Sequence, residues 1–325
     1  MCTCITYNNL GSFYFGRNLD LEYSFNERVV ITPRNYCFHF HDGSSSFKHP
    51  SLIGMASVVS GYPLYAEAVN ESGLCMAGLN FPGTAKYLGE KEGMYNVVPF
   101  EFIPWILTQC HTVKEAKEKL ESTNLVAVNF SDQLPAAPLH WMISDENNSI
   151  VVEPMEDGLH IFDNPFGVMT NNPPFDYHLY NMNNYMHLSA ENAVNRIDDS
   201  LPLKTYAEGM GALGLPGDSS SASRFVLASF LKAKASSENK EECYVAEFFR
   251  ILNKVALVKG SVVTGRGHHD ITTYSCCINV KTGVYYYITY DNLNIEAVDM
   301  HHEDLEGDEV ISYPLVETMV IHKQN

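Results

Sequence analysis

Short apolar runs interrupted by Gly, Pro, Asn and Ser dominate the first eighty residues of the chain. Runs of this length that are rich in β-branched and aromatic residues are typical of strands bounded by turns. We therefore expect strands at Thr3–Tyr7, Ser12–Gly16, Val29–Thr32, Tyr36–Phe40, Leu52–Val58, Leu64–Val69 and Leu74–Leu79. The first part of the chain is predicted to be β-structure.

Helical spacing of apolar positions begins after residue 100. Phe100–Cys110 is predicted to be helical, and a second helix is expected from Thr112, where Thr-Val-Lys-Glu forms a capping box. The clearest helices are Ala222–Ala235 and Glu242–Val258. In the latter, apolar residues recur at i, i+3, i+4 and i+7, and Gly260 is expected to cap the helix.

Strands are also predicted in the second half of the chain. A hairpin is expected to join His140–Ser144 to Ser149–Pro154 across a turn-prone Asp-Glu-Asn-Asn segment, and a further strand pair to cover Leu159–Phe162 and Gly167–Thr170. The last predicted strands are Ile271–Val280, Val284–Tyr290, Ile295–Asp299 and Val310–Tyr313. This order of elements favours an α+β fold over βαβ alternation. Because no linker or repeat divides the chain, one domain over residues 1–325 is expected.

The charge of the chain limits its possible partners. The formal net charge is -18, with 45% hydrophobic and 18% charged residues, and the sequence has no basic cluster to offset it. A nucleic acid or an acidic membrane surface would be repelled, so no nucleic-acid partner is expected. Without an apolar stretch of roughly 18 residues, no membrane insertion is expected either. The amino terminus lacks a secretory signal, which predicts a cytoplasmic protein whose cysteines stay reduced.

Several motifs match the residue pattern of a binding site but lack the sequence context that such a site requires. Gly209–Gly214 matches G-x-G-x-x-G, but a poor strand precedes it and Pro-Gly follows, so a glycine-rich loop is preferred to a nucleotide site. His39 and His41, and the histidine pairs at 268–269 and 301–302, lack a third ligand at a metal spacing. We interpret them as solvated histidines and expect neither a metal nor another cofactor.

The amino terminus offers a different chemistry. Cys2 follows the initiator Met1, and a small second residue favours removal of that methionine. Removal would leave one residue with a thiol and a free α-amine, whose ordinary pKa values of about 8.5 and 8 let the amine act as base for the thiol. By its position alone, Cys2 would equally fit a residue that merely starts a strand.

Segments spread along the whole chain bear on this choice. In order, they are Met1–Thr3, Phe15–Asp20, Gly78–Gly83, Leu139–Trp141, Thr170–Pro173, Gly214–Asp218, Ser223–Phe225 and Tyr285–Tyr287. Together they resemble the choloylglycine hydrolase family, which contains bile salt hydrolases and penicillin V acylases. Several motifs in register are far more specific than any one of them.

The resemblance implies a four-layer αββα sandwich of the N-terminal-nucleophile hydrolase type, with Cys2 as the nucleophile. Asp20 would hold the α-amine, and Arg17 and Arg224 would place positive charge near the sulfur and favour thiolate. Arg17 and Asp20 are three residues apart, on opposite faces of a regular strand. If both reach Cys2, the strand is expected to bend or bulge near Asn18.

The resemblance also implies an oxyanion hole and a substrate. Asn171 would offer its side-chain amide and Asn80 its backbone N–H to the tetrahedral oxyanion, although both also fit turn residues. Asn80 after Gly-Leu matches the bile salt branch, where penicillin acylases more often carry Tyr. The expected substrates are therefore conjugated bile salts, cut at the amide that joins the steroid carboxyl to glycine or taurine.

A rigid, apolar acyl group requires an apolar mouth. The candidates for substrate contact are Leu19, Leu64, Tyr65, Asn80, Phe81, Leu134 and Ala137, and the loop residues among them equally fit ordinary loop packing. Cys4 is expected on the face of Cys2, two residues along the strand.

Two alternatives stay open: penicillin V or N-acyl-homoserine lactone acylase activity, and a non-catalytic binding protein of the same fold. The resemblance further implies a bacterial homotetramer, with subunit contacts in the insertion around Asn181–Gly214.

Overall fold

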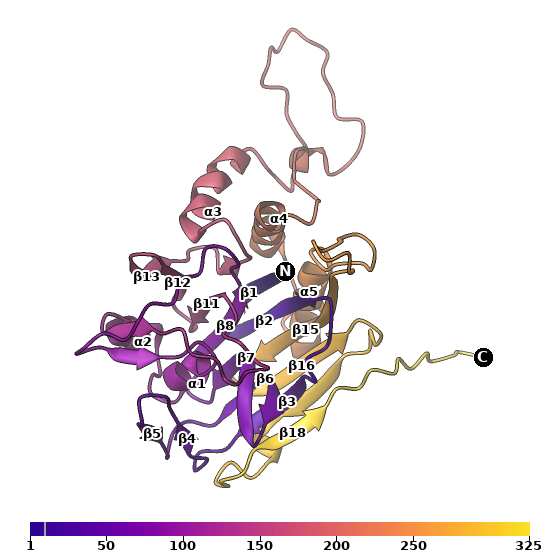
Figure 1. Cartoon of the computed structure of the whole chain (residues 1–325). Helices are drawn as coiled ribbons and strands as arrows, with labels where there is room; N and C mark the ends of the chain where they lie inside the picture. The colour runs from indigo at the N-terminus through magenta and orange to yellow at the C-terminus, as the bar shows by residue number, and fades with distance from the viewer. Residues whose placement is uncertain (10) are drawn as a thin grey trace.

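Two large antiparallel sheets form the centre of the computed structural model, which describes residues 1–9 and 11–325 (Figure 1). The six-stranded sheet has the order β14 (Val168–Met169), β1 (Cys2–Asn9), β2 (Ser12–Leu21), β15 (Ile271–Asn279), β16 (Val284–Thr289) and β17 (Glu296–Asp299). The eight-stranded sheet has the order β13 (Gly158–Asp163), β12 (Ser149–Met155), β11 (Leu139–Ser144), β8 (Cys75–Asn80), β7 (Tyr62–Asn70), β6 (Leu52–Val59), β3 (Arg28–Thr32) and β18 (Ile311–Pro314). Both the first and the last strands of the chain thus belong to these sheets.

The helices and the minor strands lie outside the two sheets. The α-helices are α1 (Phe102–Leu107), α2 (Val113–Leu120), α3 (Phe175–Asn181), α4 (Ser221–Lys234) and α5 (Glu241–Asn253). Short 3₁₀ helices are η1 (Met182–Tyr185), η2 (Met210–Ala212) and η3 (Met300–His302), and the minor pairs are β4 (Phe38–His39) with β5 (Ser45–Ser46) and β9 (Tyr95–Val97) with β10 (Thr123–Leu125). Within the described residues, no helix is both long and apolar enough to cross a membrane.

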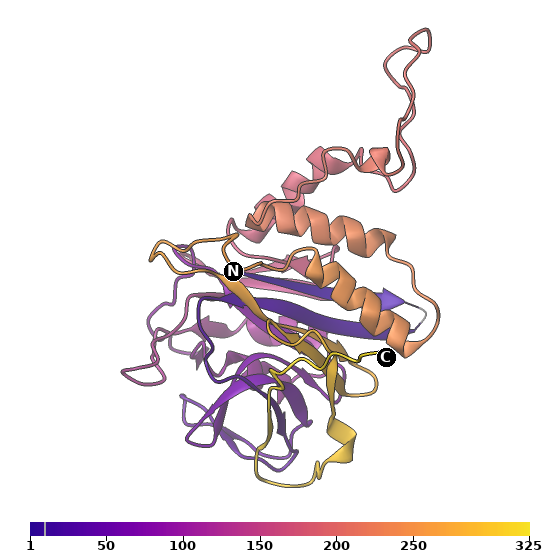
Figure 2. The ribbon, with the colours of Figure 1, turned by 90° about the vertical axis from the view of Figure 1, so that its right-hand side faces the viewer.

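The helices cover the outer faces of the two sheets. Helices α4 and α5 contact β1 and β15 of the six-stranded sheet, and α1 contacts β7 and β8 of the eight-stranded sheet. Figure 2 shows α4 and α5 lying across one face of the first sheet, with the second sheet beyond it. This arrangement confirms the predicted α+β, four-layer αββα sandwich.

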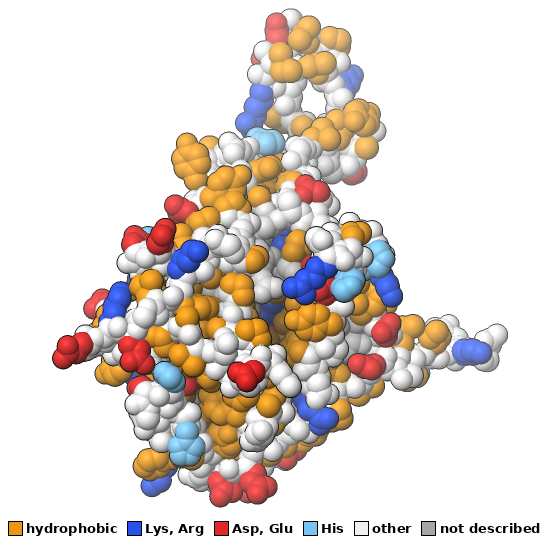
Figure 3. All heavy atoms as spheres, viewed as in Figure 1, with side chains coloured by type: hydrophobic (Ala, Val, Ile, Leu, Met, Phe, Trp, Pro, Cys, Tyr) orange, Lys and Arg blue, Asp and Glu red, His pale blue; other side chains and the backbone are white. Residues whose placement is uncertain are grey.

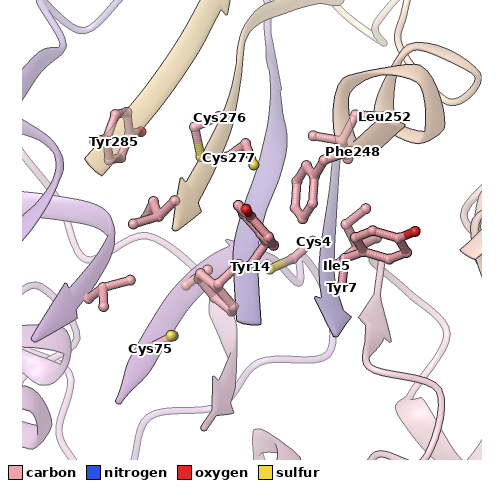
Figure 4. Close-up of a cluster of buried hydrophobic side chains, with 14 of the residues drawn as sticks. Cys4, Ile5, Tyr7, Tyr14, Cys75, Phe248, Leu252, Cys276, Cys277 and Tyr285 are labelled. Atoms are coloured by element: carbon pink, nitrogen blue, oxygen red, sulfur yellow. The ribbon is translucent and has the colours of Figure 1, made fainter. Parts of the chain in front are cut away.

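Both faces of the six-stranded sheet are buried, which explains why its strands carry few exposed positions. In β1, Cys4 packs in the core between the sheets, and Ile5 points to the other face, toward Phe248 and Leu252 of α5 (Figure 4). Successive side chains of a strand alternate between faces, so a strand covered on both sides reads as a nearly continuous apolar run. The sequence of β2, with eight of its ten residues buried, shows this pattern.

Some of the predicted local elements are confirmed and others are wrong. The hairpin β11–β12 is confirmed, and Oγ1 of Thr112 accepts a hydrogen bond from the N–H of Glu115 at 3.2 Å to cap α2. The expected pairing of the next two strands is wrong, because β13 pairs with β12 and β14 pairs with β1 of the other sheet. Helix α5 ends at Asn253, and Gly260 is not its cap. Val255 and Leu257 remain buried after the helix ends, so apolar spacing alone overestimates its length.

A long excursion without helix or strand projects from the body between η1 and η2 (Figures 1 and 2). We call residues 186–208 the protruding segment. Figure 3 shows orange, apolar atoms on the part that projects from the body. The large apolar side chains that this segment exposes are Met186, Val194, Ile197, Leu201, Leu203 and Tyr206. The backbone N–H of Ser189 donates to the carbonyl of Gly211 at 2.9 Å and ties the base of the segment together.

Candidate active site

Cys2 begins β1 inside the six-stranded sheet. It pairs with Leu19 of β2, and its side chain is only 3% exposed, in the apolar cluster between the two sheets. Its backbone N–H donates to Oδ1 of Asn171 at 2.8 Å. The position of Cys2 is therefore fixed by a strand on one side and by a side-chain amide on the other.

Met1 continues the pairing of the two strands by one residue. Its amino group donates to the carbonyl of Asp20 at 2.9 Å and lies 3.0 Å from Oδ2 of Asp270. The N–H of Asp20 in turn donates to the carbonyl of Met1 at 2.9 Å. The amino terminus is thus held against two aspartates.

The carboxylate of Asp20 is fully buried beside the amino terminus. The hydroxyl of Thr272 donates to Oδ1 at 2.6 Å, whereas Oδ2 has no hydrogen-bond partner among residues 1–9 and 11–325. Burial raises the pKa of Asp20, and the nearby positive charges of Arg224 and of the amino terminus oppose that shift. One oxygen of a buried carboxylate is therefore available for another donor.

Arg17 lies on the face of Cys2, between the two sheets. Its buried guanidinium donates to the carbonyl of Gly78 at 2.5 Å and lies 3.8 Å from a carboxylate oxygen of Glu67. Burial disfavours its charged form, but Cys2 and other facing groups outweigh burial and raise the pKa of Arg17 above its usual range. The buried guanidinium of Arg17 thus places positive charge on the face of the six-stranded sheet that carries the Cys2 side chain.

Arg17 and Asp20 lie on opposite faces of β2, as regular alternation requires. The bend expected near Asn18 is not present: the pairs between β1 and β2 run in unbroken register. The register shifts instead in β15, between residues 272 and 274. No bend is needed because Cys2 lies at the end of its strand, where its side chain occupies one face and its backbone is accessible from the other.

Asn171 and Arg224 join several elements at Cys2. Oδ1 of Asn171 accepts from Nη2 of Arg224 at 2.7 Å, and its Nδ2 donates to the carbonyl of Asn80 at 2.8 Å. Nη1 of Arg224 donates to the carbonyl of Cys2 and, at 2.6 Å, to the hydroxyl of Thr3. Burial lowers the pKa of Arg224, and nearby acidic groups oppose part of this shift. The structure therefore brings together all six residues that the sequence suggested for catalysis.

The residues suggested for substrate contact are placed differently from one another. Leu19 is buried opposite Cys2, and Leu64 is half-buried in β7. Leu134 is 40% exposed, and Ala137 lies in the same exposed loop. Leu134 and Ala137 therefore offer apolar surface to solvent, and Leu19 is adjacent to the thiol.

Tyr65 and Phe81 are turned into the protein. Tyr65 packs in the core on the outer face of the eight-stranded sheet, where its hydroxyl is 2.6 Å from Oγ1 of Thr32. Phe81 is fully buried and stacks on His140, with ring centroids 4.3 Å apart. Neither ring is exposed at the surface, although each lies in a strand or loop that borders the site.

Glu67 is a polar residue near the site to which the sequence analysis gave no role. It is fully buried and accepts hydrogen bonds from the hydroxyls of Tyr274 at 2.7 Å and Tyr285 at 2.6 Å, and from the thiol of Cys276 at 3.6 Å. Its carboxylate lies 3.8 Å from Nη1 of Arg17. The available signal was a single charged residue within an otherwise apolar strand.

Two buried histidines were also missed. His140 lies 3.0 Å from both Glu153 and the carbonyl of Thr170, and Nε2 of His178 donates to the carbonyl of Asn171 at 2.9 Å. His140 belongs to one of the segments that carry the family resemblance, but nothing in the sequence indicates its partners.

The histidines considered as metal ligands make scattered contacts. His39 contacts Ser45, and His41 lies 3.5 Å from Glu90. Across residues 1–9 and 11–325, no three His, Cys, Asp or Glu side chains gather in a way that could hold a metal ion.

A cysteine at the start of an inner strand of an αββα sandwich, surrounded by buried guanidinium, carboxylate and amide groups, is typical of hydrolases with an N-terminal nucleophile. The model of the linear amide C–N hydrolases, choloylglycine hydrolase family, matches residues 2–313 of this chain. The chain belongs to the choloylglycine hydrolase family.

Relatives match the chain along almost all of its length. A bile salt hydrolase/transferase of Lactiplantibacillus plantarum is 49% identical over 315 residues, covering 97% of each chain. A bile salt hydrolase/transferase of Clostridium perfringens is 39% identical and covers 100% of each chain. The similarity therefore includes every element described above.

Solved structures confirm the fold. A mutant of the conjugated bile acid hydrolase from Clostridium perfringens superposes with a TM-score of 0.92, at 39% identity and full coverage of both chains. Penicillin V acylase from Agrobacterium tumefaciens superposes with a TM-score of 0.77 at 20% identity, covering 96% of this chain and 91% of that one. The second likeness concerns the fold alone.

Proposed function

We propose that this protein hydrolyses conjugated bile salts at the amide between the steroid carboxyl and glycine or taurine. The observation that carries the proposal is the full-length similarity, at 49% and 39% identity, to relatives named bile salt hydrolases. The presence of Asn80 at the site supports the same branch of the family. Penicillin V and N-acyl-homoserine lactones are the alternative substrates.

The nucleophile in this proposal is Cys2 after removal of Met1. Its new α-amine would keep Oδ1 of Asn171 as an acceptor, because that oxygen already accepts from the Cys2 nitrogen at 2.8 Å. Oδ2 of Asp20, which has no hydrogen-bond partner within the described residues, is the second acceptor that we propose for it. A buried carboxylate is unfavourable without donors, so this contact would stabilise the mature form.

Arg17 is proposed to favour the thiolate. Its guanidinium donates to the carbonyl of Gly78 and lies on the same face of the six-stranded sheet as the Cys2 side chain. A nearby cation lowers the free energy of thiolate relative to thiol. Burial raises the pKa of Cys4, which lies two residues along β1 on this face, so Cys4 stays protonated.

Asn171 and Asn80 are proposed to bind the oxyanion. An amide nitrogen carries two hydrogens, and one of those on Nδ2 of Asn171 is used in the bond to the carbonyl of Asn80. The other hydrogen, together with the N–H of Asn80, is available for the developing charge. Removing one donor of this kind typically slows catalysis by about 10²–10³-fold.

The reaction then follows in two steps. The thiolate of Cys2 attacks the amide carbonyl, the C–N bond breaks, and the departing glycine or taurine takes a proton from the α-ammonium. Water, deprotonated by the α-amine, attacks the resulting thioester, which releases the bile acid and restores the thiol. Leu134 and Ala137 offer exposed apolar surface for the steroid, and the buried Leu19 is the apolar side chain paired with Cys2.

Glycine release from glycocholate and taurine release from taurocholate, measured alongside cleavage of penicillin V, test the proposal. Purified protein under reducing conditions is expected to release glycine and taurine rapidly and to cleave penicillin V slowly, if at all. Cys2→Ala, which keeps the strand, is expected to abolish all turnover. Turnover of penicillin V alone would overturn the substrate, and an intact mass that retains Met1 in an active sample would overturn the mechanism.

We further propose a single-domain, cytoplasmic homotetramer. All eight cysteines lie in the described part of the chain and are unpaired, which fits a reducing compartment. The protruding segment exposes apolar side chains such as Ile197 and Tyr206, at 80% and 85%, far from the body. Burial against other subunits would remove this surface from water.

A further inference from the structure

We propose that His140 is a positioning residue that holds the two halves of the oxyanion hole at a fixed distance. The inference rests on the proposed function of Asn80 and Asn171. His140 lies in β11, is 1% exposed, and pairs directly with Leu79, the residue before Asn80. Its ring lies between the two segments that carry the proposed donors.

The first contact of His140 is with the segment of Asn171. Nε2 lies 3.0 Å from the carbonyl oxygen of Thr170, the residue before Asn171. A carbonyl oxygen can only accept, so the hydrogen of this bond belongs to Nε2. The imidazole therefore donates to the peptide group that leads directly into Asn171.

The second contact is with the segment of Asn80. The His140 ring stacks on Phe81, with centroids 4.3 Å apart and planes 4° from parallel. Phe81 is fully buried, and its N–H donates to the carbonyl of Pro138 at 2.8 Å. Displacement of the imidazole would leave a void beside Phe81 and free the peptide that follows Asn80.

Glu153 fixes the orientation of the ring. Its Oε1 lies 3.0 Å from Nδ1 of His140, and both of its oxygens accept from the N–H of Phe175 at 3.1 Å. With Nδ1 engaged in this way, the Nε2 hydrogen is directed at Thr170. Glu153 is itself fully buried, so water does not compete for these bonds.

Other contacts also hold Asn171. Its own Nδ2 joins the two halves directly by donating to the carbonyl of Asn80 at 2.8 Å, and further contacts hold its backbone. The hydroxyl of Ser221 accepts from the N–H of Asn171 at 2.8 Å, and His178 donates to the carbonyl of Asn171 at 2.9 Å. Both act on the Asn171 side alone. Among these three polar neighbours, only His140 also contacts Phe81.

The test compares two substitutions, each of which places an amide nitrogen near the position of one of the two imidazole nitrogens. In His140→Gln the amide nitrogen can reach the carbonyl of Thr170, whereas in His140→Asn it can reach only Glu153. We expect His140→Asn to lower kcat for glycocholate by about 10- to 100-fold with KM changed less than about threefold, because the hole acts in the transition state. His140→Gln is expected to retain more activity than His140→Asn.

Two reagents separate the oxyanion hole from the nucleophile. Acylation of Cys2 by 4-nitrophenyl butyrate passes through a tetrahedral oxyanion, and alkylation by iodoacetamide does not. His140→Asn is expected to slow acylation by about 10- to 100-fold and to leave alkylation within about twofold. Equal losses in both rates would mean damage at Cys2 and would overturn the proposal. These rates do not depend on the natural substrate, so a parent protein that is inactive on bile salts would contradict only the proposed function.

Two further variants control for stability and for the role of Glu153. Trp141→Phe alters the next residue, which is as deeply buried but packs on the opposite face of the sheet. It is expected to lower the melting temperature without changing the ratio of acylation to alkylation. In Glu153→Gln the amide nitrogen can donate to Nδ1 and the amide oxygen can accept from the N–H of Phe175, so this variant is expected to preserve most of kcat. A folded His140→Asn protein with parental acylation would refute the positioning role.

Discussion

His178 shows how burial fixes the protonation state of a single residue. Its Nε2 donates to the carbonyl of Asn171, and its Nδ1 has no partner within the described residues. Burial lowers the pKa of His178 below its ordinary value of about 6.5, although the bond to Asn171 opposes the shift. The folded protein therefore carries this histidine neutral in conditions where the unfolded chain binds a proton.

This state predicts a pH dependence of stability. Below about pH 6.5 the unfolded chain binds the extra proton, so the free energy of unfolding falls as the pH falls. His178→Gln keeps a donor for Asn171 and removes the titration, so it should lose less stability than the parent between pH 7 and pH 5. Urea unfolding at several pH values measures the difference, with the exposed His322→Gln as control. Identical pH slopes in parent and His178→Gln would refute the assignment.

The residues of the site differ in how far the sequence reveals them. Cys2, Arg17 and Asp20 lie within 20 positions of one another and near a distinctive terminus, so a sequence motif can carry them. Glu67 and its donors Tyr274 and Tyr285 are about 200 residues apart, and only the meeting of the two sheets joins them. A buried polar residue can be recognised in the sequence as a polar position within an apolar strand, but its hydrogen-bond partners cannot.

At the level of elements, strand positions follow from local composition, but strand partners do not. The hairpin β11–β12 is closed by a short turn in which Asp145 accepts from the N–H of Asn147 and Asn148, each at 2.8 Å. Such local bonds are encoded where they occur. By contrast, β14 pairs with β1, more than 150 residues away, and no local pattern specifies that choice.

The close approach of β2 and β15 gives a prediction about one glycine. A Cβ on Gly16 would lie 2.0 Å from the carbonyl oxygen of Cys276, which belongs to the backbone and cannot move aside. Gly16→Ala is expected to destabilise the protein by about 3 kcal/mol or to prevent folding. Gly89→Ala, where an added Cβ meets nothing within 4 Å, is the control. The free energy of unfolding is measured in urea where the variants are soluble, and the soluble yield is compared where they are not. Equal values for Gly16→Ala and Gly89→Ala would refute the prediction.

At the scale of the whole molecule, the protruding segment is the feature that packing within one chain does not account for. It carries no helix or strand, and its large apolar residues stay exposed. With a formal net charge of -18, copies of the chain repel one another at long range, and burial of these apolar residues would offset that repulsion in the proposed tetramer.

We expect the double substitution Ile197→Asp and Tyr206→Asp to dissociate the proposed tetramer. Charged residues at these positions would disfavour burial between subunits. Light scattering coupled to size exclusion is expected to show four chains of 36.5 kDa for the parent and fewer for the variant. Val320→Asp, at a position 57% exposed in the carboxyl-terminal tail, should leave the mass unchanged. A monomeric parent, or a variant that stays tetrameric, would contradict the proposed assembly.

The two ends of the chain differ in a way that matters for handling the protein. The first strand begins in the interior, where Asp20 and Asp270 close around the amino group. After Pro314 the chain stays bonded to the body as far as Val320, whose N–H donates to Oδ1 of Asn294 at 2.7 Å, and its last, exposed residues end in solvent (Figure 1). An affinity tag or a covalent link to a solid support at the amino end would add residues where the proposed mechanism requires Cys2 to be exposed by processing. Attachment through the carboxyl end avoids this, and it is the route to an immobilised form of the enzyme.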